Sequence, residues 1–253
     1  MSLLHALILG IVEGITEFLP ISSTAHLILA SRMLRLDSEF VKSFEIIIQF
    51  GAILSVVVLY WNKFWHWDVL KKLVVAVIPT GVIGLTVYKA VKGYLLGNLT
   101  VVLLSLLIGG IALIVFERFR SGSETDVDFA ELTYRKAFLI GLFQAIAVIP
   151  GVSRSAATIV GGSLIGISKR TIVEFSFMLA VPTMLAATGL ELVKSRDALS
   201  GNYGMLAVGF IVSFITAVIA IKSFLGYIKT RDFSAFGWYR VVLAAVYYLV
   251  FLR

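Results

Sequence analysis

Two carboxylic acids occupy an apolar, helix-like run near the start of the chain, where ionisable groups are costly. Glu13 and Glu17 are four residues apart, so on a helix they share one face, one turn apart. Ionisable residues within such runs usually mark function. Together they could hold a hard divalent cation such as Mg²⁺ or Ca²⁺, or one could act as a base. The alternative is that Glu17 pairs with a loop cation and Glu13 faces water.

The segment Pro-Ile-Ser-Ser-Thr that follows places three hydroxyl groups at the start of the next helix-like run. Unpaired N–H groups at such a helix start favour an anion such as phosphate. Capping accounts for one hydroxyl of Ser22, Ser23 and Thr24, but not for three. His26 lies three residues after Ser23, close enough to orient or deprotonate its hydroxyl. We interpret Ser23 and His26 as candidate catalytic residues and Ser22 and Thr24 as substrate-binding residues, although His26 could also be only a satisfied polar group.

A related segment, PGVSRSAAT, sets Arg154 at the start of another apolar run. Arginine stays charged, and its planar fork matches two phosphate oxygens. We therefore expect Arg154 to be catalytic, while its alternative role, an ion pair with Glu17, is compatible with phosphate binding. The hydroxyl groups that we expect to bind substrate beside it belong to Ser153, Ser155 and Thr158.

The segment FEIIIQFGA carries a second polar pair with a spacing of four, Glu45 and Gln49. We expect these residues to support the site residues or to line a cavity rather than to react. Plain hydrogen bonding between helices is the alternative.

The two hydroxyl-rich segments are copies of one pattern, related by an offset of 131 positions. This offset aligns Gly10 with Gly141 and Ser22 with Ser153, while the prolines slip by one position. In each copy an apolar run breaks at proline, passes through a hydroxyl-rich turn and resumes. The chain therefore repeats a broken helix.

The composition predicts an all-α integral membrane protein. Hydrophobic residues make up 59% of the chain and charged residues 15%, with a mean hydropathy of +0.99. The apolar runs are long enough to span a bilayer as helices and lack the alternation of a membrane barrel. The first run has no basic start, so we do not expect a signal peptide. The loop lysines and arginines behind the net charge of +7 are expected to set the orientation of the protein in the membrane. No nucleic-acid partner is predicted.

Along the chain we expect one broken helix followed by three membrane spans, and then a second set of the same four elements. The predicted ranges are 3–19 with 23–36, 44–61, 73–89 and 99–116, then 137–149 with 154–167, 172–193, 204–221 and 238–252. The broken arms are too short to cross comfortably, so we expect re-entrant hairpins whose tips share one interior site. This fold is a single membrane domain, 1–253, with inverted repeats at about 1–117 and 136–253.

The lysines and arginines predict the orientation. If each hairpin returns to its starting side, thirteen of these residues, Arg240 included, lie on one side and eight on the side of the termini, with Arg154 completing the 22. Because cytoplasmic loops are richer in positive charge, both termini are expected outside. An interfacial position without a functional role is expected for the aromatic residues Trp61, Trp65, Trp67, Trp238 and Tyr239.

The segments EGITEFLPISSTAH and PGVSRSAAT resemble the two signature segments of the bacterial undecaprenyl-pyrophosphate phosphatases, the bacitracin-resistance family, and FEIIIQFGA is similar to the next span of that family. The resemblance covers essentially the whole chain. It implies an enzyme of the bacterial cytoplasmic (inner) membrane that removes the terminal phosphate of undecaprenyl pyrophosphate and so regenerates the lipid carrier for peptidoglycan. It also implies dependence on divalent cations and an active site open to the outer (periplasmic) face. The family's site residues fall on Glu13, Glu17, Ser22, Ser23, His26, Ser153, Arg154 and Thr158.

Several alternatives stay open. The nucleophile could be Ser23, His26 or a water molecule. A polyprenyl-phosphate transporter or flippase, or an ion-coupled carrier of a small anion, would use the same anion site without a nucleophile. The segment SRSAATIVGGSL lacks the histidine of the acid-phosphatase type of lipid phosphatase, so that type is excluded. The sequence does not decide whether the protein forms a homodimer.

Overall fold

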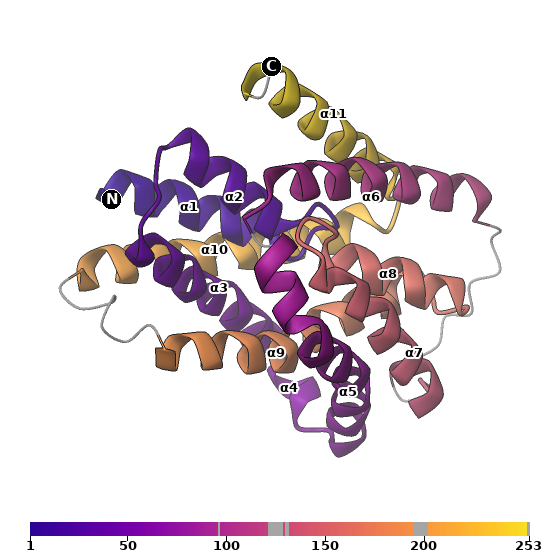
Figure 1. Cartoon of the computed structure of the whole chain (residues 1–253). Coiled ribbons are helices and arrows are strands. Elements are labelled where there is room, and N and C mark those ends of the chain that lie inside the picture. The colour runs from indigo at the N-terminus through magenta and orange to yellow at the C-terminus, as the bar shows by residue number, and fades with distance from the viewer. Residues whose placement is uncertain (96, 121–128, 130–131, 195–201, 252–253) are drawn as a thin grey trace.

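The computed structural model describes residues 1–95, 97–120, 129, 132–194 and 202–251 (Figure 1). Most of the loop between the two halves therefore lies outside the described residues. The elements of the first half are α1 (Leu3–Thr16), α2 (Ser23–Met33), α3 (Glu39–Leu59), α4 (Trp61–Phe64), α5 (Trp67–Ala90), the π-helical segment η1 (Val91–Leu95) and α6 (Leu99–Phe119). Those of the second half are α7 (Tyr134–Ala145), the 3₁₀ turn η3 (Ile146–Val148), α8 (Arg154–Leu164), α9 (Lys169–Lys194), α10 (Tyr203–Tyr227) and α11 (Ser234–Phe251).

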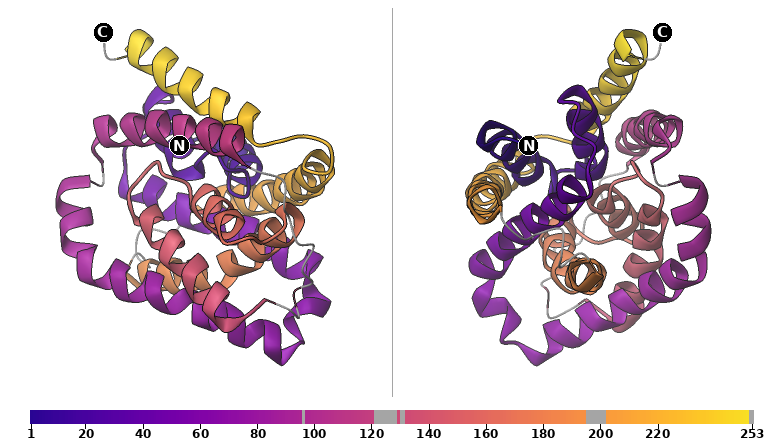
Figure 2. Two further views of the ribbon diagram at one scale, coloured as in Figure 1. Left: turned by 90° about the vertical axis from the view of Figure 1, so that its right-hand side faces the viewer. Right: turned by 60° about the vertical axis from the view of Figure 1, so that its left-hand side comes forward.

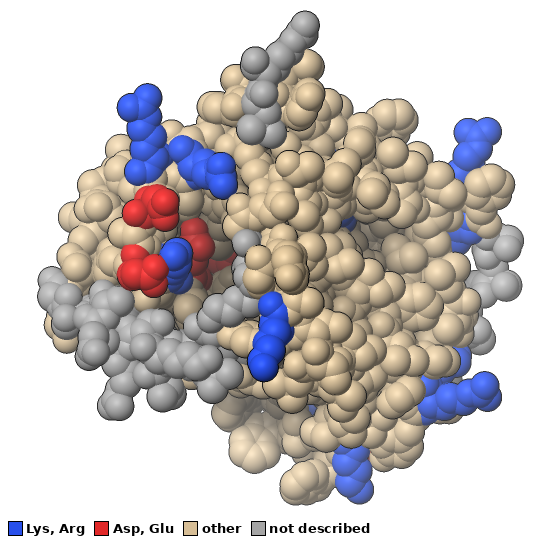
Figure 3. Space-filling view, viewed as in Figure 1, with Lys and Arg blue, Asp and Glu red and all other residues tan. Residues whose placement is uncertain are grey.

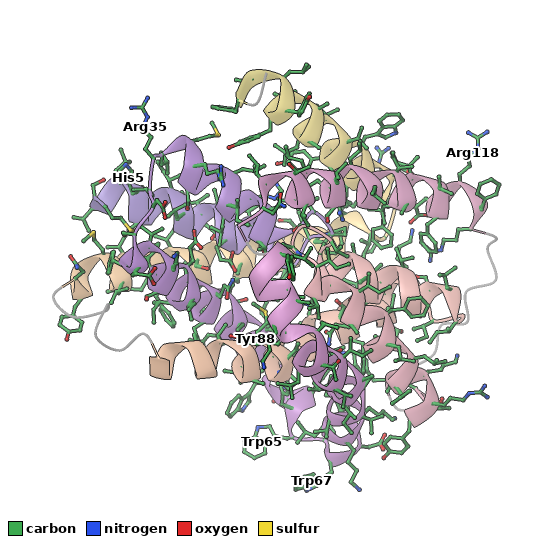
Figure 4. All side chains as sticks on the ribbon, in the orientation of Figure 1. His5, Arg35, Trp65, Trp67, Tyr88 and Arg118 are labelled. Carbon is green, nitrogen blue, oxygen red and sulfur yellow. The ribbon has the colours of Figure 1, made fainter. Side chains whose placement is uncertain are left out.

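Five helices in the described part of the chain are long and apolar enough to cross a membrane, namely α3, α5, α6, α10 and α11. The chain is a multi-pass membrane protein, as the composition predicts. Figure 3 shows a broad uncharged surface with basic side chains mostly near its margins. In Figure 4, Trp65 and Trp67 project outward at one end of the molecule, away from His5 and Arg35.

Of the six expected spans, the one at 172–193 corresponds to α9, which is not among those five helices. Residues 171–181 of α9 are all buried, so this stretch is a core helix covered by the rest of the protein. It contacts α3, α5 and α8. The expected boundaries differ by several residues elsewhere because hydropathy detects only the apolar part of a helix. For example, α3 already begins after Ser38, whose hydroxyl accepts a hydrogen bond from the N–H of Val41.

Both predicted broken helices are present. The chain leaves α1 at Thr16 and begins α2 only at Ser23, and it leaves η3 at Val148 and begins α8 only at Arg154. The residues before the second arms, Ser22 and Ser153, have positive φ angles of 72° and 79°, which are rare for residues other than glycine. Each of these serines caps its helix with its hydroxyl. The offset of 131 positions thus relates two turns of the same unusual geometry.

The packing of the helices follows the same offset. α1 lies along α10, and α7, its counterpart, lies along α5, the counterpart of α10. Glycines allow these close contacts, because a Cβ atom on Gly14 would lie 2.4 Å from the carbonyl oxygen of Ser213, and one on Gly141 would lie 2.0 Å from that of Ala76. α6 and α11 form a third pair, seen side by side in Figures 1 and 2. Figure 2 also shows α5 and η1 as a curved arm at the edge of the molecule.

Arg240 is not the loop cation that the sequence suggested. It lies on α11 with none of its side chain exposed, and its guanidinium donates hydrogen bonds at 2.9 to 3.3 Å. The acceptors are the carbonyl groups of Pro20, Ser105, Leu106, Gly151 and Val152. All five N–H groups of the guanidinium are therefore used. The orientation count missed this residue because it treated every charge near a predicted helix end as a loop charge.

We expect replacement of Arg240 to destabilise the whole protein. Arg240→Met leaves five buried carbonyl groups without their donor, which should cost about 3 to 5 kcal/mol and lower the midpoint of thermal unfolding in detergent by at least about 6 °C. Arg240→Lys should fall between this variant and wild type, because an ammonium group has only three donors. The exposed Arg231 provides the control, and Arg231→Met should leave the midpoint almost unchanged. Equal midpoints for Arg240→Met and wild type would contradict the assigned role.

Candidate active site

Glu17 connects the two broken helices. It lies in the turn after α1, only 7% exposed, and its Oε1 is 3.0 Å from Nη2 of Arg154 at the start of α8. Its other oxygen, Oε2, accepts a short hydrogen bond from the hydroxyl of Ser23 at the start of α2. The structure thus brings together three of the four candidate catalytic residues. Figure 1 shows α2 at the upper left of the molecule, level with the left end of α6, and α8 to the right of the centre, below α6.

Arg154 is held by α9 as well as by Glu17. Its Nη1 donates to the carbonyl oxygen of Ser176 at 2.7 Å and to the hydroxyl of Ser176 at 3.3 Å. Thr158, one turn along α8, shares a hydrogen bond of 2.6 Å with the same hydroxyl. Nε of Arg154 is buried and has no partner. The guanidinium is therefore fixed in direction while one of its donors remains free for a ligand.

Sequence reasoning missed Ser176, which orients both Arg154 and Thr158. The only signal in the sequence is a serine within the apolar run FSFML. A single serine in an apolar helix is too common to identify a site.

The other predicted hydroxyl groups either form hydrogen bonds within the protein or are exposed at its surface. Ser22 and Ser153 accept hydrogen bonds from the N–H groups of Ala25 and Ala156, so they cap their helices. The hydroxyl of Ser155 donates a hydrogen bond to the carbonyl oxygen of Phe18 at 2.8 Å. Thr24 is exposed in the first turn of α2. Capping therefore accounts for one of the three hydroxyls in the first turn, as expected, while Ser23 binds Glu17.

His26 does not make the hydrogen bond to Ser23 that the spacing suggested. Its Nδ1 lies 2.8 Å from the carbonyl oxygen of Ser22, and its Nε2 lies 2.8 Å from the hydroxyl of Tyr239 on α11. The spacing rule for helices failed here because the Ser23 side chain turns back across the break toward Glu17. Tyr239, expected to have only an interfacial position, is instead a direct partner of a candidate site residue.

Glu13 has no exposed surface, and neither of its carboxylate oxygens has a hydrogen-bond partner. Glu17 is its strongest charged neighbour, and Glu45 and Arg154 also act on it. A buried carboxylate beside two others is costly unless a proton or a cation is shared. Oxygen ligands of this kind fit a hard divalent cation. Among the described residues, no group of three or more histidines, cysteines or acids is placed to hold a metal ion.

Glu45 and Gln49 lie on α3, outside the group of direct contacts around Glu17. Glu45 accepts a hydrogen bond of 2.8 Å from the hydroxyl of Ser31 on α2. Gln49 is half-buried one turn farther along α3. The supporting role that the sequence suggested for both residues stays a prediction, and the hydrogen bond of Glu45 to Ser31 is also what plain helix-to-helix bonding would give.

Comparison with known proteins relates nearly the whole chain to one family. Residues 6–246 match the family described as bacitracin resistance protein BacA. The chain is 51% identical to the undecaprenyl-diphosphatase of Aquifex aeolicus, over 98% of both chains. It is 52% identical to the protein of that name from Bdellovibrio bacteriovorus, over 97% of this chain and 95% of the other, and 47% identical to that of Persephonella marina over the full length of both. This chain therefore belongs to the bacitracin resistance protein BacA family.

Proposed function

We propose that this protein is an undecaprenyl-diphosphatase, a membrane hydrolase that converts undecaprenyl pyrophosphate into undecaprenyl phosphate and inorganic phosphate. The name of its relatives suggests the substrate, and one observation carries the chemistry. Glu17 holds the guanidinium of Arg154 on one oxygen and the hydroxyl of Ser23 on the other. An anion-binding group and a hydroxyl nucleophile are thus placed on the same carboxylate, deep inside an apolar protein.

We further propose that the chain is an inverted repeat with two re-entrant hairpins. The paired contacts of α1 with α10 and of α7 with α5 support this topology, as do the matching turns at Ser22 and Ser153. In such a fold the broken backbone lies in the interior at the interface of the repeats. The two hairpins would then enter from opposite faces and meet at Glu17 and Arg154.

We assign the protein to the bacterial cytoplasmic membrane, with the site open to the outer face and both termini outside. The orientation count supports this assignment after correction. Because Arg240 is buried, the count becomes twelve against eight, and the richer side is still the one opposite the termini.

In this proposal Arg154 binds the terminal phosphoryl group. Its unpartnered Nε donates to a phosphate oxygen while Nη2 stays on Glu17, which keeps this carboxylate beside the hydroxyl of Ser23 as the base. Glu17 then accepts the proton of Ser23 while Oγ of Ser23 attacks the terminal phosphorus. The bond from that phosphorus to the bridging oxygen breaks, and undecaprenyl phosphate leaves. Water subsequently hydrolyses the phosphoserine, which releases inorganic phosphate and restores the hydroxyl.

A divalent cation, Mg²⁺ or Ca²⁺, fits Glu13 best, with Glu17 as the second carboxylate. Glu13 is buried with both oxygens unpaired, whereas both oxygens of Glu17 already have partners. Such an ion, when bound, neutralises charge on the phosphates. Mg²⁺ commonly binds through one or two carboxylates together with substrate phosphates and water, which agrees with a protein that offers two carboxylates.

Phosphate release by the purified protein tests the proposed function. In detergent, without any gradient, the wild type should release phosphate from a long-chain prenyl pyrophosphate, whereas a carrier would release none. Arg154→Ala and Glu17→Ala should each lower kcat at least about 100-fold, since each removes a preorganised charged contact. Glu39, exposed and paired only with Lys42, provides a matched acidic control, and Glu39→Ala should keep the wild-type rate. Near-normal rates for Arg154→Ala and Glu17→Ala would reject the assigned site.

Trapping a covalent intermediate tests the nucleophile. Rapid quenching during turnover of substrate labelled in its terminal phosphate, in acid and in parallel in denaturant at mildly alkaline pH, should leave an acid-stable label on the peptide that contains Ser23, and Ser23→Ala should abolish that label. An acid-labile phosphoramidate on His26 would instead identify the imidazole as the nucleophile. Absence of label at every time point would favour direct attack by water.

Metal titration tests the role of Glu13. A chelator should stop phosphate release by the wild type, and added cation should restore it. Glu13→Gln should require at least about tenfold more cation, because an amide is a weaker ligand than a carboxylate. The same cation should raise the unfolding midpoint of the wild type more than that of Glu13→Gln, independently of activity. Identical titrations for Glu13→Gln, wild type and the Glu39→Gln control would argue against Glu13 as a ligand.

A further inference from the structure

Both ring nitrogens of His26 have partners, and these partners are of different kinds. Nδ1 lies 2.8 Å from a backbone carbonyl oxygen, that of Ser22, which can only accept a hydrogen bond. Nδ1 must therefore carry a proton. Nε2 lies 2.8 Å from the hydroxyl of Tyr239, which can donate or accept. In the neutral ring, Nε2 then accepts the proton of the Tyr239 hydroxyl.

The surroundings of His26 favour this neutral ring. The residue is half-buried in α2, and Arg240 on α11 is the charged group that acts on it. Burial of the imidazole, the largest effect, and the positive charge of Arg240 disfavour a second proton and together outweigh the carbonyl group of Ser22, which favours one. Nε2 is consequently the one basic nitrogen of His26, and the Tyr239 hydroxyl is bound to it.

Tyr239 is itself held in place by its neighbour in the chain. Arg240 fixes this part of α11 through five hydrogen bonds to carbonyl groups of α6 and of both helix breaks. The rings of Tyr239 and His26 are parallel within 4°, with centroids 5.5 Å apart. The side chain of Tyr239 remains 45% exposed. A residue from the last helix thus reaches a side chain of the first broken helix.

We propose that Tyr239 is a positioning residue for the phosphatase reaction, which fixes the orientation and tautomer of His26 by donating a hydrogen bond to Nε2. The proposal rests on the proposed function. It gives α11 two roles in the site: Arg240 joins the two helix breaks, and Tyr239 directs the imidazole. It also means that both ring nitrogens of His26 are occupied in this structure, Nδ1 by the carbonyl group of Ser22 and Nε2 by the hydroxyl of Tyr239, so His26 can act on the substrate through Nε2 only when that hydroxyl moves aside.

Tyr239→Phe removes the hydroxyl and keeps the ring, so it isolates this hydrogen bond. We expect kcat for phosphate release to fall about threefold to tenfold with KM unchanged, the effect of one neutral hydrogen bond. Tyr248, on the same helix and 56% exposed, provides the matched control, and Tyr248→Phe should behave as wild type. The double variant His26→Ala with Tyr239→Phe should be no slower than His26→Ala, because Tyr239 acts through His26.

A spectroscopic measurement keeps this test independent of turnover. The chain has three histidines, so ¹⁵N-histidine labelling gives few signals, and His26→Gln identifies those of His26. In Tyr239→Phe the Nε2 signal should move toward that of an unbonded pyridine-type nitrogen, while the Nδ1 signal stays in place. Movement of both signals would indicate general disruption and overturn the proposal, as would unchanged signals with unchanged kcat. A wild type that releases no phosphate would refute the proposed function, whereas the ¹⁵N signals would still test the hydrogen bond.

Discussion

The binding of one buried guanidinium by five carbonyl groups determines how this protein can interrupt its helices inside an apolar fold. Breaking a helix frees backbone groups that have no water to bind at membrane depth. Arg240 satisfies Pro20 at the first break and Gly151 and Val152 at the second, and it ties both to α6 through Ser105 and Leu106. The positive φ angles at Ser22 and Ser153 persist because the surrounding structure fixes these turns. Both breaks therefore keep their irregular backbone inside the protein with the carbonyl groups of Pro20, Gly151 and Val152 hydrogen-bonded.

The same constraint explains the charges of the site. A buried charge is tolerated when it is paired and hydrogen-bonded, and Glu17 and Arg154 meet this condition across the interface of the two halves. Glu13 does not meet it, since both of its oxygens are buried without a partner. An unsatisfied carboxylate is a cost to stability, and proteins retain such costs where a ligand relieves them. In the proposed function, a bound cation would satisfy the carboxylate of Glu13, and the substrate phosphate would satisfy the unpartnered Nε of Arg154.

The sequence predicted the features that depend on local chemistry. Proline followed by hydroxyl groups predicted both helix breaks, the long apolar runs predicted the spans, and ionisable residues in those runs predicted that Glu17 and Arg154 would meet. It could not predict the partners of His26, because Tyr239 lies 213 residues away and no local rule connects them. The same holds for Arg240, which is 220 residues from Pro20. In the sequence, Arg240 follows Trp238 and Tyr239 and so resembles an interfacial anchor. Only the packing of α11 against α6 shows that Arg240 is buried. The local rule that did apply, the spacing of Ser23 and His26, gave the wrong pairing because Glu17 competes for the hydroxyl.

The repeated fold carries a site that is not repeated. Position by position, Glu13 corresponds to Gln144, Ser23 to Arg154 and His26 to Ala157. Gln144 is neutral, and its amide donates to the hydroxyl groups of Thr80 and Thr183, so the second half has no counterpart of the unpaired carboxylate. In the proposed mechanism, the first half thus supplies the acids, the hydroxyl nucleophile and the imidazole, and the second half supplies the guanidinium that binds phosphate. Phosphoryl transfer needs an attacking group with its base and also positive charge on the phosphate oxygens, and these two kinds of group come from different halves of this chain. The unequal distribution of charge between equal turns is therefore the strongest internal argument for an enzyme.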